Sequence, residues 1–226
     1  MNVIISPSSM TFTPPQGDTR TETKDFTVSV SLRQDAPAFV ATQLRLVPDL
    51  QPGTGEGQEA VTNPTQIAVT PGYFNLYNVR LDGKIAEGGP DSEVTFPMVI
   101  ENFSNGDTRF EFSVAQEGGT PEGFQTALPS PLTVRSQATG GENTQGQATF
   151  QVFTPFKNGY VNRIASIDLQ VDSFYAADTN IEGASSQVST LTKTKGFYVP
   201  GPGAALSAIA MTGVALALTK SRQRIE

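Results

Sequence analysis

The sequence predicts an all-β protein built as an antiparallel β-sandwich. Apolar and polar residues alternate in several short segments, 21 Gly and 16 Pro residues punctuate the 226-residue chain, and no segment before Gly196 has the period of a helix. Strict alternation indicates a strand with one buried face, and frequent turns separate short strands. The length allows one large sandwich or two small ones, of Ig-like or jelly-roll type.

Five segments alternate strictly enough to be predicted as strands. In the first, Phe26, Val28, Val30 and Leu32 are separated by Thr27, Ser29 and Ser31. The other four have their alternating apolar residues at 94–100, 110–114, 148–152 and 167–171. Weaker candidates are 3–5, 10–12, 44–46, 67–69, 74–81 and 132–134. A mostly antiparallel arrangement follows from this series of short strands.

The strongest turn signal is Asn105-Gly106, which lies between two of these segments. Asn and Gly tolerate the positive φ that a type I′ turn requires. The sequence therefore predicts that Val94–Asn102 and Arg109–Val114 pair antiparallel as a tight hairpin.

Composition changes along the chain suggest a division into segments. Residues 48–64 are rich in Gly, Pro, Gln and Glu and almost free of apolar side chains, which indicates a long exposed loop or a linker. We expect an N-terminal β region at 1–64, a β-sandwich domain at 65–182, a linker at 183–202, a hydrophobic anchor helix at 203–219 and a basic tail at 220–226.

The composition argues against an enzyme. The chain has no His and no Cys, which excludes imidazole bases, thiol nucleophiles and the usual zinc sites. Catalysis by paired carboxylates stays formally open, but no acidic pair stands out. We assign no catalytic, cofactor-binding or metal residue. The net charge of -7 argues against a broad basic face, so nucleic acid is not expected as the main partner of this chain.

The second half of the chain resembles the Ig-like modules of the CARDB and NEW3 families. The residues that carry the resemblance are Val94 to Asn102, Asn105-Gly106, Phe110 to Val114, Pro121 to Phe124, Leu132 to Val134, Ala148 to Pro155 and Ile167 to Ser173. The resemblance implies a spacer or adhesive unit without catalytic residues.

A membrane anchor is predicted at Gly203–Thr219, which contains no charged residue and precedes Lys220, Arg222 and Arg224. As a helix this run would be about 25 Å long, slightly short of the hydrocarbon core. With Val199-Pro200-Gly201-Pro202 ahead of it, the tail is similar to PEP-CTERM and PGF-CTERM sorting tails, although Gly201 stands where those motifs have Glu or Phe. The alternative is an Ala-rich helix packed on a neighbouring subunit.

Two groups of side chains are candidates for ligand binding. Asp168, Asp172, Asp178 and Glu182 gather near the last predicted strand, where they would bind calcium or act as solvated charges; no calcium-loop spacing is present, which favours the second interpretation. Tyr73, Phe74 and Tyr77 would form either a sugar-binding platform or part of the core. Alternation places the two tyrosines on one face and Phe74 on the other, and core packing is favoured.

One formal glycosylation sequon, Asn102-Phe103-Ser104, lies at the predicted turn. It matters only in a compartment where proteins are glycosylated.

Three functions are compatible with these features. The first is a cell-surface structural or adhesive protein, anchored to a membrane by Gly203–Thr219 and contacting copies of itself or other surface proteins. The second is a capsid protein of a virus with an internal membrane, which would explain why the N-terminus carries no visible export signal. The third is a carbohydrate-binding accessory module.

Overall fold

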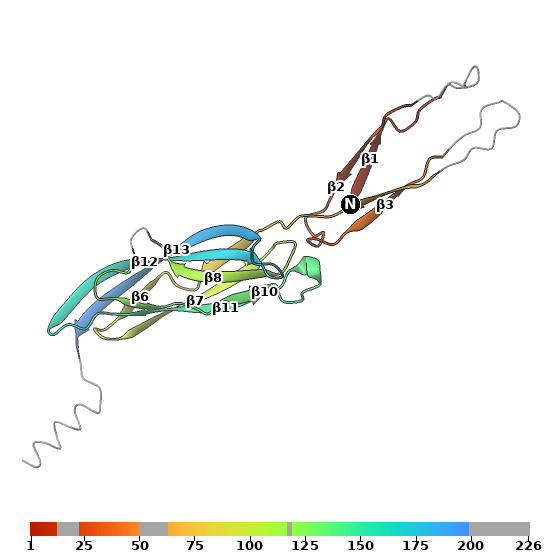
Figure 1. Ribbon diagram of the computed structural model, residues 1–226. Helices are drawn as coiled ribbons and strands as arrows, with labels where there is room; N and C mark the ends of the chain where they lie inside the picture. The colour runs from red at the N-terminus through yellow and green to blue at the C-terminus, as the bar shows by residue number, and fades with distance from the viewer. Residues whose placement is uncertain (13–22, 50–62, 117–118, 199–226) are drawn as a thin grey trace, which may run out of the picture.

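The computed structural model describes residues 1–12, 23–49, 63–116 and 119–198, and within these ranges the chain is all-β (Figure 1). Its strands there are β1 (Asn2–Ser6), β2 (Thr27–Ser31), β3 (Thr42–Leu46), β4 (Thr65–Val69), β5 (Tyr77–Leu81), β6 (Ile85–Gly88), β7 (Glu93–Asn102), β8 (Thr108–Val114), β9 (Gln125–Ala127), β10 (Leu132–Val134), β11 (Gln145–Phe153), β12 (Tyr160–Tyr175) and β13 (Glu182–Phe197). The five strictly alternating segments correspond to strands β2, β7, β8, β11 and β12, although Phe26 and Leu32 lie just outside β2.

Strands β5 to β13 form one β-sandwich. One sheet has the order β10-β8-β12-β13-β6 and the other the order β5-β7-β11-β9. All neighbouring strands in the two sheets are antiparallel except β6, which runs parallel to β13. The predicted all-β, mostly antiparallel class is therefore confirmed.

The chain changes sheets at both long sides of the sandwich. On one side β5, an edge strand of the four-stranded sheet, is followed by β6 at the edge of the five-stranded sheet, and on the other side β9 is followed by β10 in the same way. The order β5-β7-β11-β9 facing β8-β12-β13 corresponds to the immunoglobulin arrangement, in which strands A, B, E and D face C, F and G. The connectivity is therefore Ig-like.

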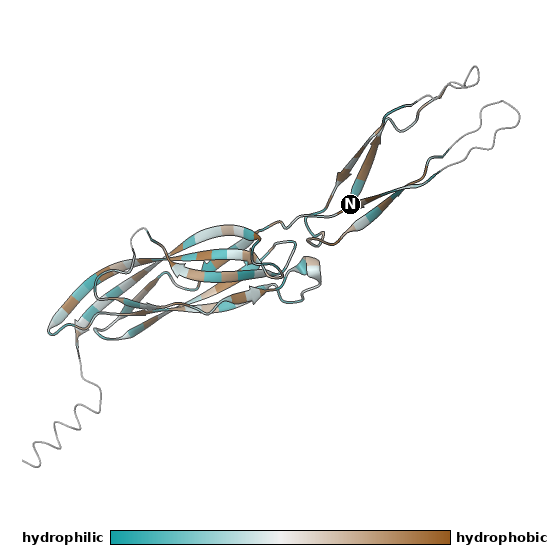
Figure 2. Ribbon diagram, in the orientation of Figure 1, coloured by the Kyte–Doolittle hydropathy of each residue, from teal (hydrophilic) through white to brown (hydrophobic). Residues whose placement is uncertain are grey.

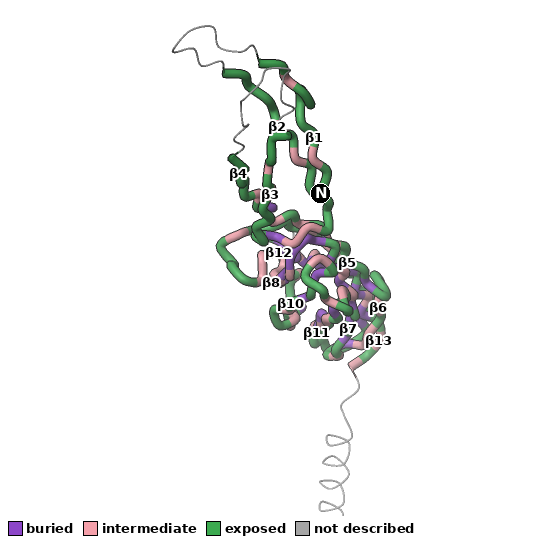
Figure 3. The backbone as a smooth tube through the Cα atoms, turned by 90° about the vertical axis from the view of Figure 1, so that its right-hand side faces the viewer, coloured by how far each residue is buried: buried purple, intermediate pink, exposed green. Residues whose placement is uncertain are grey.

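The core lies between these two sheets. Its buried residues are Leu81, Val94, Phe96, Met98, Ile100, Phe110, Phe124, Val134, Phe150, Val152, Ala165, Ile167, Leu169 and Val171. In β7 the buried residues alternate with outward-facing ones along the whole strand, as its sequence pattern predicts. In Figure 3 the buried positions gather in the sandwich.

Strands β1 to β4 form an arm that extends away from the sandwich (Figure 1). Among the described residues β1 pairs only with β2, and β3 only with β4, so the described arm consists of two antiparallel ribbons. Residues 48–64 therefore connect two strands of one ribbon, and the change from arm to sandwich comes after Val69 rather than after residue 64.

The predicted hairpin at Asn105-Gly106 is wrong. β7 pairs with β5 and β11 in one sheet, whereas β8 pairs with β10 and β12 in the other. Their connection is an arch across the core, because the apolar faces of the two strands are buried against each other and cannot lie in one sheet. Neither Asn105 nor Gly106 has the positive φ that a type I′ turn needs.

The linker expected at 183–202 is also wrong for the part that the structure describes. Residues 182–197 are β13, a 16-residue strand between β12 and β6. The candidate at Met10–Phe12 does not form a strand.

The predicted helix at 203–219 lies outside the described residues. No helix in the described part of the chain is long and apolar enough to cross a membrane.

Candidate assembly surface

Each ribbon of the arm has one apolar face. In the first ribbon Val3 lies opposite Val30, and Ile5 lies opposite Val28. In the second, Leu44 lies opposite Ile67. Residues that lie opposite each other in an antiparallel pair share a face, so each set forms a continuous apolar strip. In Figure 2 apolar residues are visible along the arm strands.

These apolar faces are only partly covered: Val3, Val28, Val30 and Leu44 are half-buried. No residue of β1, β2, β3 or β4 is buried, and Ala38 is the only buried residue among those that the structure describes from 1 to 70 (Figure 3). On these faces Ile5 is 42% exposed and Ile67 37%, and Phe26, just before β2, is 49% exposed. The described part of the arm therefore has no buried core of its own.

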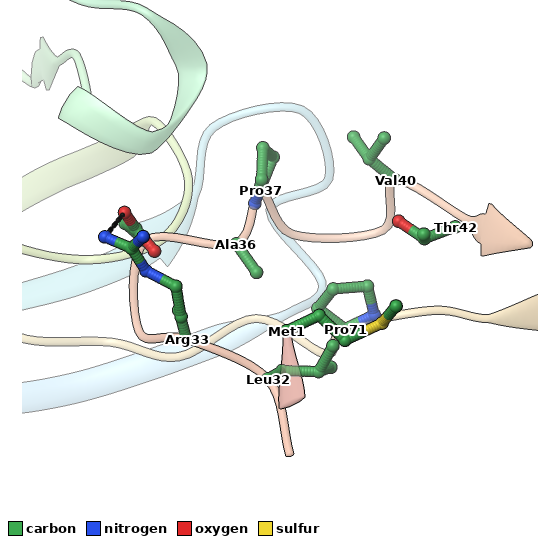
Figure 4. A pocket seen from close by; sticks show the side chains of 9 residues that line it. Met1, Leu32, Arg33, Ala36, Pro37, Val40, Thr42 and Pro71 are labelled. Atoms are coloured by element: carbon green, nitrogen blue, oxygen red, sulfur yellow. Dashed lines mark ion pairs between the residues drawn. The ribbon is translucent and has the colours of Figure 1, made fainter. Parts of the chain in front are cut away.

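A shallow hollow of about 260 Å³ lies where the arm meets the sandwich (Figure 4). It is lined by Met1, Leu32, Arg33, Asp35, Ala36, Pro37, Val40, Thr42 and Pro71. The exposed ion pair of Arg33 with Asp35, at 2.8 Å, lies at its rim. The other lining side chains are mainly apolar, so the hollow continues the apolar surface of the ribbons.

Asn105 fastens the arm to the sandwich. Its side-chain Nδ2 donates to the carbonyl oxygens of Ala36 (3.1 Å) and Gly72 (2.9 Å), and its Oδ1 accepts from the backbone N–H of Phe74 at 2.7 Å. Its carbonyl accepts from the N–H of Ala38 at 2.9 Å. Since Asn105 is only 4% exposed, these bonds hold both chain segments of the joint against the β7–β8 arch.

Aromatic side chains pack over the same joint. The ring of Tyr175 lies 5.2 Å from that of Phe39 and 5.1 Å from that of Tyr73. Phe39 has a φ of 59°, an unfavourable conformation for a bulky residue, and its N–H donates to the Pro71 carbonyl at 2.8 Å. A side chain at Gly106 would come within 2.8 Å of Tyr175, which explains the glycine there.

The aromatic candidates for a sugar platform belong to the fold instead. The Tyr77 ring packs edge-on against Phe110 at 5.1 Å, and its hydroxyl lies 3.1 Å from the carbonyl oxygens of Val171 and Ala184. Burial raises the pKa of the Tyr77 hydroxyl above its ordinary value of 10.0. Phe74 precedes β5 and is 44% exposed.

The acidic candidates are spread apart. Asp168 and Asp172 lie on the outer face of β12, four residues and hence roughly 13 Å apart along the strand. Asp178 lies in the turn after β12, where its carboxylate accepts from Asn180 at 2.8 Å. Among the described residues no three acidic, His or Cys side chains are close enough to hold a metal ion.

The asparagine side chain of the sequon is inaccessible in the folded protein. Asn102 is 1% exposed, and its Nδ2 donates to the carbonyl oxygens of Gly106 (3.2 Å) and Val134 (3.0 Å). The nitrogen that a sugar would modify is therefore buried and bonded.

No protein-family model and no curated protein sequence matches the chain. Solved structures with a similar fold include an ASH / PapD-like domain of human CEP192, with a TM-score of 0.34 and 12% identity over 54% of this chain and 87% of that one. Self-complemented MyfA, the major subunit of Myf fimbriae from Yersinia enterocolitica, has a TM-score of 0.33 and 14% identity over 53% and 99% of the two chains. The E. coli chaperone DraB has a TM-score of 0.33 and 12% identity over 55% and 58%.

Proposed function

We propose that this protein is a non-enzymatic structural or adhesive subunit, held to a membrane by Gly203–Thr219, that associates with copies of itself through the arm. The observation that carries the proposal is that no residue of the two amphipathic ribbons is buried. A two-stranded ribbon alone is marginal in water and needs another layer against its apolar face. The sandwich does not supply that layer, because the arm extends away from it (Figure 1).

A second copy of the arm fits the uncovered faces by its chemistry. The apolar faces consist of uncharged side chains, and the one charged residue within the ribbon strands, Arg45, lies opposite Gln66 on a polar face. Two arms therefore meet without repulsion between like charges. Packing sheet against sheet would bury both apolar faces and leave the polar faces in solvent.

The sequence supports the remaining parts of the proposal. The uncharged run Gly203–Thr219 and its similarity to sorting tails favour membrane attachment at the extracellular surface, and the resemblance to CARDB and NEW3 modules favours a spacer or adhesive role. A capsid subunit would use the same arm contacts, and it would be identified by particles that contain both this protein and nucleic acid.

Sedimentation of the full-length protein in mild detergent tests the arm contact. The test variant places lysines on the apolar faces, Ile5→Lys with Ile67→Lys, and the matched control places them on the polar faces, Ser29→Lys with Gln66→Lys. Each buried Ile contributes about 1.5–3 kcal/mol, and each 1.4 kcal/mol is about tenfold in affinity. We therefore expect the test variant to lower the association constant by about 100-fold or more.

The control variant should associate like the unmodified protein. A protein that stays monomeric at every concentration, or two variants that weaken association equally, would contradict self-association through the apolar faces.

A further inference from the structure

Two aromatic pairs, Phe156 with Tyr198 and Tyr160 with Phe197, lie at the end of the sandwich opposite the arm, and we call these four residues the aromatic pole. The rings of Phe156 and Tyr198 are 4.8 Å apart, and those of Tyr160 and Phe197 are 5.3 Å apart. Phe156 is 56% exposed, Tyr160 52% and Phe197 65%. Large apolar rings at such exposure leave a surface that favours contact with something outside the fold.

The backbone holds these rings in place. Tyr160 and Phe197 are the terminal pair of the long β12–β13 ladder, so their positions are fixed by the sheet. Two glycines with positive φ flank them, Gly159 at 93° and Gly196 at 130°. The sheet therefore fixes the backbone of one pair of the pole, at the end of the sandwich where β13 finishes (Figure 1).

The uncharged run Gly203–Thr219 begins shortly after the aromatic pole, which limits how far the pole can lie from that run. Five residue steps separate Tyr198 from Gly203. Because a fully extended chain covers at most about 3.6 Å per residue, Gly203 lies within roughly 18 Å of Tyr198. If Gly203–Thr219 enters a bilayer, the pole is within reach of the polar headgroups, a layer about 5–8 Å thick on each side of the membrane.

The side chains at the pole suit that layer. Tyrosine is favoured at membrane–water interfaces, phenylalanine inserts into the boundary from the apolar face of interfacial elements, and lysines near the surface interact with anionic lipids. Lys157 follows Phe156 directly, and Lys195 is two residues before Phe197. The neighbouring Lys193 is neutralised by its 2.9 Å ion pair with Glu87.

We infer that the aromatic pole is a membrane-contact surface that seats the sandwich on the headgroup layer of a bilayer containing anionic lipid. The inference rests on the proposed anchoring by Gly203–Thr219. It adds that the folded domain itself touches the lipid, so the sandwich stands on the membrane with its arm directed outward.

The chain has no Trp, so a single introduced Trp is a clean fluorescent reporter. We compare full-length Phe197→Trp with the control Phe103→Trp, an exposed (55%) Phe in the β7–β8 arch near the arm. Both are reconstituted with vesicles of phosphatidylcholine and phosphatidylglycerol, with and without lipids brominated near the headgroup. We expect blue-shifted emission and several-fold stronger bromine quenching for Phe197→Trp than for Phe103→Trp; Phe156→Trp should behave like Phe197→Trp.

Flotation of the same samples separates the two claims. Protein that floats with vesicles while both Trp reporters stay unquenched would overturn the membrane-contact surface and leave anchoring intact. Protein that does not float would overturn both. A blue shift that depends on protein concentration in lipid-free detergent, without quenching in vesicles, would show that the pole contacts a second copy and would also overturn the inference.

Discussion

Asn105 connects three parts of the chain through one residue. Its side chain bonds the backbone of Ala36, Gly72 and Phe74, and its own backbone bonds Ala38 and Phe74. Because buried backbone groups cost free energy when they lack partners, the short polar side chain of Asn, with donors and an acceptor together, suits this position. The joint therefore depends on hydrogen bonds more than on apolar packing.

Replacing Asn105 by Ala should loosen the joint. It leaves one N–H and two carbonyl groups without their side-chain partners, so we expect a loss of about 1–3 kcal/mol in the free energy of unfolding. We also expect a broader distribution of molecular lengths in small-angle X-ray scattering, because the arm would no longer be held in one direction. The control is Asn158→Ala, at an exposed position before β12, which should change neither measurement. Equal scattering curves for the two variants would show that Asn105 does not fix the arm.

At this scale the sequence predicted where a connection lies but not which strands it joins. Asn105-Gly106 does mark the break between β7 and β8, yet local turn preference cannot distinguish a hairpin from an arch between sheets. That choice is made by the apolar faces of Phe96 and Phe110, which are buried in one core. The joint itself could not be predicted, because its partners are 31 to 69 residues from Asn105 in the sequence.

At the scale of elements, β13 is a central strand whose inward side chains include three threonines. Thr190, Thr192 and Thr194 are fully buried. The Thr190 hydroxyl donates to the Ile167 carbonyl at 2.9 Å, whereas the hydroxyls of Thr192 and Thr194 have no hydrogen-bond partner. A buried hydroxyl without a partner destabilises the folded state.

Replacing these threonines by Val should change the free energy of unfolding in opposite directions, depending on whether the hydroxyl is hydrogen-bonded. Thr192→Val or Thr194→Val removes an unpartnered hydroxyl and keeps the shape, so each should raise the free energy of unfolding by about 1 kcal/mol. Thr190→Val removes a bonded hydroxyl and should lower it by about 0.5–1.5 kcal/mol. Urea denaturation followed by circular dichroism measures all three. The same sign for all three variants would mean that water or a shifted rotamer satisfies Thr192 and Thr194.

The same threonines explain why β13 was missed from the sequence while β7 was found. Apolar alternation is visible in β7 at Val94, Phe96, Met98 and Ile100. In β13 the inward threonines are polar, so the strand shows no apolar alternation. Their β-branched shape, which favours strands, was the available signal. β6 and β9 were missed for another reason: with four and three residues they are too short to show a period.

At the scale of the whole molecule, the apolar faces of the ribbons and the aromatic pole lie at opposite ends. The ribbons of the arm extend from one end of the sandwich, and the aromatic pole lies at the other, where the chain continues to Gly203–Thr219 (Figures 1 and 3). The sandwich between them has its own buried core. Under the proposed function it therefore acts as a spacer, which sets the distance between the membrane and the contacts between copies.

This division of the molecule predicts two levels of local stability. Segments with few buried apolar contacts open at little cost in free energy, whereas core strands open only when the whole domain unfolds. In a dilute monomeric sample we therefore expect backbone amides of β1 to β4 to exchange hydrogen for deuterium almost as fast as in an unfolded chain. Amides of β7 and β12 should be strongly protected, because these strands carry most of the core.

Assembly should slow hydrogen exchange in the arm and leave exchange in the sandwich unchanged. As protein concentration rises, packing of the ribbons against another copy would bury their apolar faces, so exchange in β1 to β4 should slow while exchange in β7 and β12 stays constant. The Ile5→Lys, Ile67→Lys variant is the control, because its arm should stay fast at every concentration. Strong protection of the arm in the dilute monomer would contradict the prediction, since the ribbons would then be stable without a partner and their exposed faces would need another explanation.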